Sequence, residues 1–204
     1  MARAECPKCK RPPVSCYCQD LGEETACMDL LILQHPKETR HPLNSARIAQ
    51  LGIRNCEILV GEDFIENNRL QDILNERKTC LLFPSPEAQS TGEYLDENGK
   101  PDLCIVIDGT WRKARKIYYL NPALQDLPAI SLRDTGRSEY KIRKSPSDKA
   151  LSTIEAAVAL LREVGNNKQA HQQCLDAFEK MISLQIDAMG RDVYKNNYRS
   201  RAPD

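Results

Sequence analysis

The sequence lacks several features that would assign it to a common class of protein. No apolar run approaches the roughly 20 residues that a membrane-spanning helix needs. The first ten residues contain no apolar stretch that resembles a signal peptide, so we expect a cytoplasmic protein with no membrane partner. The formal net charge is zero, which argues against a protein that coats nucleic acid non-specifically but leaves room for a local basic patch.

Three widespread catalytic motifs are also missing. There is no GxGxxG after a predicted strand, no P-loop and no GxSxG turn. Dinucleotide binding, nucleoside triphosphate hydrolysis and serine hydrolase chemistry therefore have no support. The length of 204 residues suits one domain with a small appendage, and 41% hydrophobic and 28% charged residues are typical of a soluble globular chain.

The middle of the chain alternates strand-like and helix-like patterns. Short apolar runs predict strands at 29–33, 56–60, 79–83, 103–107 and 129–132, and several are apolar nearly throughout, as in a parallel sheet covered on both faces. Helices are predicted at 45–52, at 70–77, from after Ser147 to Gly165 and in a last segment whose inward face carries Cys174, Phe178, Met181, Ile182 and Gln185. The segment 84–102 is predicted to be a surface excursion. This pattern favours an α/β domain, in which ligands bind beyond the carboxyl ends of the strands.

Four of the nine cysteines precede residue 19. Cys6 and Cys9 form a CxxC pair, and Cys16 and Cys18 form a CxC pair. Four thiolates at this spacing can bind one tetrahedral zinc, which would be structural because no coordination position stays open. Such a site stabilises a segment too short to bury a core of its own. The alternatives are unrelated surface cysteines or a redox CxxC.

A polar tetrapeptide, Asp108-Gly109-Thr110-Trp111, directly follows the predicted strand 103–107. Asp108 offers a carboxylate where sheets of this class bind ligands, Thr110 offers a hydroxyl, and Trp111 offers a flat face for stacking. The alternative is that Asp108 caps a helix and Trp111 packs in the core.

Two basic stretches accompany this tetrapeptide and together favour an RNA phosphate track, although each alone fits a solvated surface. The first contains Arg112, Lys113, Arg115 and Lys116. The second is a loop that contains Arg133, Arg137, Lys141, Arg143 and Lys144.

Two further polar groups leave alternatives open. Ser152 and Glu155 share one helical face, where the carboxylate either binds an amine or adenosine hydroxyls or complements the helix dipole. His35 and Glu38 follow the first strand, but His35-Pro36 is a turn dipeptide, which disfavours a metal site there.

The order of these motifs resembles the DTW-domain proteins, whose characterised members are tRNA-uridine aminocarboxypropyltransferases. The resemblance covers about residues 6–165. Its motifs are Cys6-x-x-Cys9-x-Arg11-Pro12-x-x-x-Cys16-x-Cys18, His35-Pro36-Lys37-Glu38, Phe83-Pro84-Ser85, Asp108-x-Thr110-Trp111, Tyr140-Lys141-Ile142-Arg143-Lys144 and Leu151-Ser152-Thr153-Ile154-Glu155-Ala156.

The resemblance implies a SPOUT-like α/β fold: a mostly parallel sheet with helices on both faces and a knotted region that binds S-adenosylmethionine (SAM). It implies a four-cysteine zinc-binding segment at 1–22, a transferase domain at 23–195 and a polar tail at 196–204. The expected SAM contacts are Pro84, Ser85, Thr110, Trp111, Ile130, Leu132, Arg143, Leu151, Ser152 and Glu155. The expected RNA contacts are Arg112, Lys113, Arg115, Lys116, Arg137, Lys141 and Lys144.

The activity implied is transfer of the aminocarboxypropyl group of SAM to N3 of a tRNA uridine, with Asp108 as the base that accepts the N3 proton. Resemblance to bacterial members favours a uridine in the variable loop, and we expect a monomer. One alternative is a SAM-dependent RNA methyltransferase on the same fold. Another is a zinc-containing RNA-binding protein without catalysis.

Overall fold

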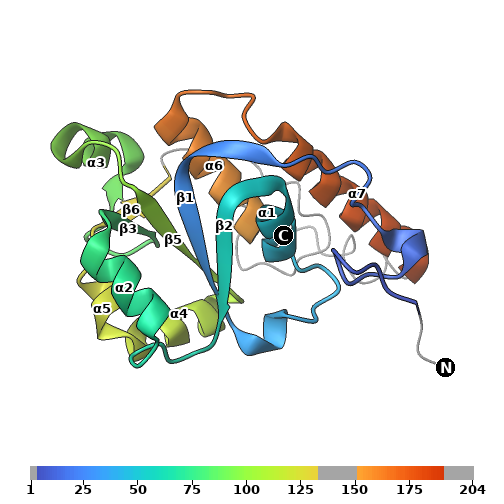
Figure 1. Cartoon of the computed structure of the whole chain (residues 1–204), viewed down its shortest axis with the longest axis horizontal. Coiled ribbons are helices and arrows are strands. Elements are labelled where there is room, and N and C mark those ends of the chain that lie inside the picture. The colour runs from blue at the N-terminus through green and yellow to red at the C-terminus, as the bar shows by residue number, and fades with distance from the viewer. Residues whose placement is uncertain (1–3, 133–150, 191–204) are drawn as a thin grey trace, which may run out of the picture.

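The computed structural model describes residues 4–132 and 151–190. Within them, one six-stranded sheet has the order β2-β1-β5-β3-β6-β4, and every neighbouring pair is parallel (Figure 1). The predicted α/β class with a mostly parallel sheet is therefore confirmed. The strands are β1 (Glu24–Gln34), β2 (Ile53–Val60), β3 (Thr79–Leu82), β4 (Gln89–Ser90), β5 (Leu103–Asp108) and β6 (Ala129–Ser131).

Helices cover both faces of the sheet (Figure 1). One face packs against α1 (Ala46–Gly52), α3 (Thr91–Asn98), α6 (Thr153–Gly165) and α7 (Gln172–Met189). The other packs against α2 (Asn68–Glu76), α4 (Trp111–Leu120) and α5 (Pro122–Gln125). Alternate residues of β1 enter the two cores, Leu30 and Ile32 on the first face and Leu31 and Leu33 on the second. Both faces of the central strands are therefore buried, which explains their continuous apolar sequences. No helix of the described residues is long and apolar enough to cross a membrane.

The five predicted strands are confirmed, but the prediction for 84–102 is wrong. That segment contains β4 and α3. Ser90 accepts a hydrogen bond from the backbone of Glu93, whose carboxylate accepts one from the backbone of Ser90, so the pair forms a capping box. Tyr94 anchors the helix because its side chain is buried in the core. The solvent-facing polar residues of α3 gave this stretch the composition of a loop.

The predicted helices are confirmed with changes at their ends. Leu151 was expected inside a helix, but α6 begins at Thr153 because Ser152 has extended backbone and caps it. At α1, the side chain of Ser45 does not cap, and Asn44 instead accepts from the backbone N–H of Arg47 at 3.1 Å. The face predicted for the last helix lies on α7, where Cys174, Phe178, Met181 and Ile182 are buried and Gln185 is half-buried.

Candidate active site

The carboxylate of Asp108 lies at the carboxyl end of β5, in the middle of the sheet. Gln34 ends the neighbouring strand β1 in register with it. The side-chain Nε2 of Gln34 donates to Asp108 Oδ2 at 2.8 Å, and the hydroxyl of Thr153 donates to Asp108 Oδ1. Asp108 is buried, and it does not cap α4, because Thr110 occupies the N-cap position. The alternative role considered for Asp108 therefore does not hold.

An apolar pocket of about 280 Å³ lies beside this carboxylate. The ends of β3, β5 and β6 and the first turns of α4 and α6 form its walls, as expected for a ligand site in a parallel sheet. Six of the predicted SAM contacts line it: Pro84, Trp111, Ile130, Leu132, Leu151 and Ser152. Ser85, Thr110 and Glu155 are not among its lining residues. Most, but not all, of the predicted SAM contacts that the structure describes therefore line this one pocket.

Trp111 lies at the edge of the pocket, not in the core. Its side chain is 40% exposed, so the alternative that it packs in the interior does not hold. Phe83 meets it edge to face with ring centroids 6.5 Å apart, and Tyr118 stacks on Phe83 with centroids 4.4 Å apart. These contacts hold Trp111 with one part of its ring free for a ligand.

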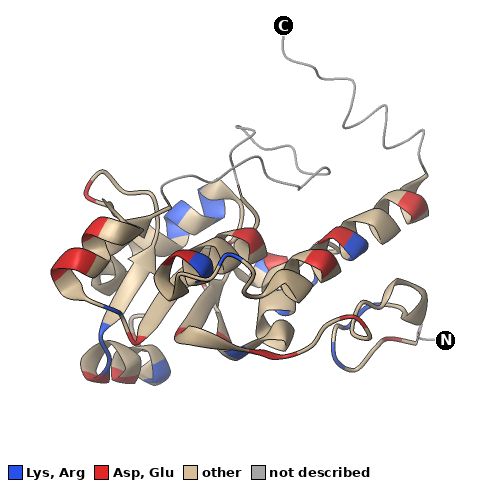
Figure 2. Ribbon diagram, turned by 90° about the horizontal axis from the view of Figure 1, so that it is seen from above, with Lys and Arg blue, Asp and Glu red and all other residues tan. Residues whose placement is uncertain are grey.

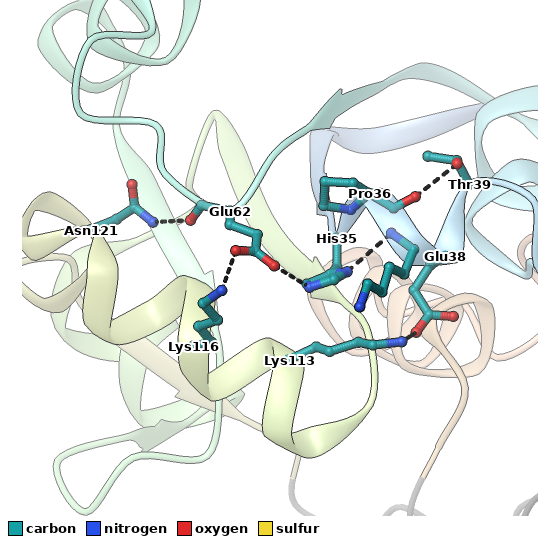
Figure 3. Close-up of polar contacts among 9 residues, drawn as sticks. His35, Pro36, Glu38, Thr39, Glu62, Lys113, Lys116 and Asn121 are labelled. Carbon is teal, nitrogen blue, oxygen red and sulfur yellow. Dashed lines mark hydrogen bonds and ion pairs between the residues drawn. The ribbon is translucent and has the colours of Figure 1, made fainter.

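Acidic partners hold two of the four cations predicted to bind RNA on α4. Lys113 Nζ lies 2.6 Å from Glu38 Oε1, and Lys116 forms an ion pair with Glu62 (Figure 3). The hydrogen bond from Lys116 is the main cause of a lowered pKa at Glu62. Arg112 and Arg115 are exposed. The positive charge that α4 offers to a ligand is therefore smaller than its sequence indicates.

His35 connects the motif that follows the first strand, residues 35–38, to the candidate site. Its Nδ1 accepts from the backbone N–H of Lys37 at 3.1 Å, so Nε2 carries the proton that points to Glu62 Oε1, 2.5 Å away (Figure 3). Its backbone N–H donates to the carbonyl of Asp108 at 3.0 Å. His35 and Glu38 therefore connect the loops after β1 and β2 to α4.

Ser152 and Glu155 form a capping box at the start of α6. Ser152 accepts from the backbone of Glu155, and Glu155 Oε2 accepts from the backbone of Ser152 at 2.7 Å. Both side chains therefore have a structural role as caps of α6. A contact of either side chain with SAM stays a prediction. The predicted contacts Arg137, Lys141, Arg143 and Lys144, and Arg133 beside them, lie outside the described residues.

The four cysteines of the N-terminal segment converge on one point. Their sulfur atoms all lie within 4.8 Å of one another, with 3.9 Å between Cys6 and Cys18 and 3.7 Å between Cys9 and Cys16. A tetrahedral zinc with Zn–S bonds of about 2.3 Å separates its sulfurs by about 3.8 Å. Burial raises the pKa of Cys9 and Cys18, whereas backbone hydrogen bonds lower the pKa of Cys6 to about 6. The set can therefore hold a metal ion.

Sequence reasoning missed two residues that contact Asp108. Thr153 lies within a motif of the family resemblance but was not expected at the site. Gln34 was not singled out at all. One signal was available for Gln34, because a polar residue ends the otherwise apolar strand β1, and parallel strands end at the same edge of a sheet.

Comparison with known proteins identifies the family of this chain. A family model described as the DTW domain matches residues 3–186. The chain belongs to this family. It is 34% identical over 192 residues to a Drosophila melanogaster protein named tRNA-uridine aminocarboxypropyltransferase 2, an alignment that covers 91% of this chain and 76% of the relative.

More distant relatives carry similar names. A Macaca fascicularis protein, also named tRNA-uridine aminocarboxypropyltransferase 2, is 30% identical over 90% of this chain, and the alignment spans 64% of the relative's length. An Arabidopsis thaliana protein named tRNA-uridine aminocarboxypropyltransferase A is 23% identical over 90% of this chain and 81% of the relative. No solved structure matches the chain significantly.

Proposed function

We propose that this protein transfers the 3-amino-3-carboxypropyl group of SAM to N3 of a uridine in tRNA. The observation that carries the proposal is a buried carboxylate, Asp108, fixed by two donors beside an apolar pocket in a DTW-domain chain. The names of the relatives support the reaction class. The variable loop is the proposed location of the uridine.

In the proposed reaction, the donor lies in the pocket beside Trp111, and the uridine approaches Asp108. Asp108 accepts the N3 proton as N3 attacks the γ-carbon of the methionine part of SAM. The new N–C bond forms as the C–S bond breaks, and methylthioadenosine leaves with the bonding electron pair. Since attack on the methyl carbon would give methylation instead, the main task of the pocket is to present the γ-carbon. Arg143 or Lys144 is the proposed partner of the donor carboxylate.

The finer structural assignments belong to the same proposal. We assign Zn²⁺ to Cys6, Cys9, Cys16 and Cys18, since their separations suit a tetrahedral ion. It would hold the fold of the segment and take no part in the reaction. The proposal also includes a SPOUT-like knotted region that binds SAM and a division of the chain into segments at 1–22, 23–195 and 196–204. It further includes a monomeric state and a cytoplasmic location.

Mass spectrometry of tRNA nucleosides after incubation with SAM tests the reaction. We expect a uridine whose mass increases by an aminocarboxypropyl group, with methylthioadenosine as the second product. A uridine heavier by a methyl group, with S-adenosylhomocysteine, would identify a methyltransferase instead. Unchanged tRNA with no methylthioadenosine would contradict the proposal and favour an RNA-binding protein without catalysis.

A further inference from the structure

A second and larger cavity lies next to the candidate site. It is a groove of about 1070 Å³ between the described part of the four-cysteine segment (residues 4–22), the loop that follows β1, and the carboxyl-terminal half of α7. The short turn η1 (Pro13–Ser15) in the four-cysteine segment contacts α7, and Figure 1 shows this segment beside the end of that helix. The groove is therefore formed by parts of the chain that are far apart in sequence.

The groove has a strongly cationic lining, although the whole chain carries no net charge. Four cations, Lys10, Arg11, Arg40 and Arg47, line it against one carboxylate, Glu5. Charged residues also occur along the rest of the described ribbon, where α3 carries only acidic ones and α4 only basic ones (Figure 2). A concave surface that collects one sign of charge attracts a polyanion.

The four cations do not have the same role. Arg47 donates to the carbonyl of Lys8 at 2.9 Å, and Arg11 donates to the carbonyls of Ser15 and Pro42, so these two residues fasten the four-cysteine segment to the domain. Lys10 and Arg40 are exposed, and within the described part of the chain neither forms an ion pair. Lys10 and Arg40 are therefore available to a ligand.

The groove and the apolar pocket approach the same carboxylate from two sides. Gln34 lines the groove and donates to Asp108 Oδ2, whereas Thr153 lines the pocket and donates to Asp108 Oδ1. In the sheet, the groove includes residues at the ends of β1 and β2, and the pocket lies over β5, β3 and β6. Asp108 itself lines neither cavity, but its two carboxylate oxygens are thus bonded to one wall residue of the cationic groove and one of the apolar pocket.

We propose that this groove is the RNA-binding surface, with Lys10 and Arg40 on phosphates and the acceptor uridine entering toward Asp108 from the side of Gln34. The inference rests on the proposed function and assigns its two substrates to opposite sides of one carboxylate. It also moves RNA recognition away from α4, where Lys113 and Lys116 are already paired with Glu38 and Glu62. The four-cysteine segment then serves RNA binding by forming one wall of the groove.

The test compares charge reversals of equal size at three places. The variant Lys10→Glu/Arg40→Glu changes the groove, and Arg112→Glu/Arg115→Glu changes α4. The matched control, Lys100→Glu/Lys168→Glu, changes two exposed lysines that line neither cavity. Binding of fluorescently labelled tRNA is measured without SAM over a range of salt concentrations, and thermal melting confirms that each variant is folded.

We expect the groove variant to bind tRNA at least about tenfold more weakly at low salt. The slope of log affinity against log salt concentration should become shallower by about one for each of the two residues replaced. The control and the α4 variant should bind within about twofold of the unmodified protein. A groove variant with unchanged affinity, or a larger loss in the α4 variant, overturns the inference, and so does an unmodified protein that does not bind tRNA.

The outcome is separable from that of the proposed reaction. Formation of methylthioadenosine by the unmodified protein tests the reaction, whereas the affinities measured without SAM test the surface. Unchanged affinity of the groove variant together with product formation would overturn only the location of the RNA.

Discussion

Gln34 holds Asp108 in a fixed orientation. Its side-chain Nε2 donates to Asp108 Oδ2 at 2.8 Å and to Asn44 Oδ1 at 3.1 Å, so both hydrogens of this amide nitrogen are engaged. Asn44 Oδ1 also accepts from the backbone of Arg47 at the start of α1. A chain of hydrogen bonds therefore connects the first turn of α1 with the candidate base, and Gln34, Asn44 and Arg47 in this chain all line the cationic groove.

Replacing Gln34 should impair the reaction more than the binding of SAM. Gln34→Leu keeps the approximate size of the side chain but removes the N–H donors from Asp108 and Asn44. Loss of one hydrogen bond to a buried charged group costs about 1.5–3 kcal/mol, so we expect single-turnover rates at saturating tRNA and SAM to fall by about tenfold or more. The KM for SAM should change little, because Gln34 does not line the apolar pocket. An unchanged rate would show that Gln34 does not position the base.

Asp108→Asn should separate catalysis from binding. The amide has the shape of the carboxylate but cannot take the proton from N3, so we expect product formation to fall by about a hundredfold or more. The affinity for tRNA and the melting temperature should stay close to those of the unmodified protein. Liquid chromatography of methylthioadenosine measures the rate, and filter binding measures the affinity. A variant that retains full activity would exclude Asp108 as the base.

Removal of one cysteine ligand should release the metal and loosen the N-terminal segment. In Cys16→Ser a poorer ligand replaces a thiolate, so we expect zinc to fall well below one equivalent by elemental analysis and proteolysis to begin within 1–22. Cys27→Ser is the matched control, because Cys27 is half-buried outside the cluster and donates only to the carbonyl of Leu161. Equal zinc contents in the two variants would argue against the assignment.

The sequence was sufficient for those parts of the fold and site that depend on local pattern. The central strands could be recognised because burial on both faces makes them continuously apolar, and Asp108 could be placed because it directly follows one of them. The cluster of four cysteines was readable because its ligands lie close together in sequence. Each of these features needs only neighbouring residues.

Other features depend on contacts between distant parts of the chain. Whether Lys113 or Lys116 is free to bind RNA is decided by Glu38 and Glu62, which come from other loops. Gln34 reaches Asp108 only because β1 and β5 are adjacent in the sheet, which the strand sequences do not reveal. The groove likewise requires the four-cysteine segment to meet α7. Sequence patterns therefore located the base but not the residues that orient it.

The capping box of α6 offers a test of the role of Glu155. Ser152→Ala removes the acceptor for the backbone of Glu155, and we expect it to lower the free energy of unfolding by about 1 kcal/mol. Glu155→Gln keeps an acceptor at the same position but removes the charge. If capping is the main role, this variant should retain its KM for SAM within about twofold. A KM raised by tenfold or more would instead support the predicted contact between Glu155 and SAM.

His171 should make the protein less stable in weak acid. Its side chain is buried, its Nδ1 has no hydrogen-bond partner within the described residues, and burial lowers its pKa despite the nearby carboxylate of Glu24. The unfolded chain, in which histidine titrates near pH 6.5, therefore binds the proton more readily than the folded one. The contribution of His171 to stability is thus complete above about pH 6.5 and is lost as the pH falls toward the lowered pKa of the folded state.

Asn is the matched replacement, because the backbone of His171 has a φ of 57°, which Asn tolerates better than most residues. We expect urea unfolding to show a smaller loss of stability between about pH 6.5 and pH 5 in His171→Asn than in the unmodified protein. The melting of either form above about pH 7 should not depend on this group. If both proteins lose the same free energy over the acidic range, the protonation that destabilises the fold occurs at carboxylates, and the burial of His171 has no measurable linkage to folding.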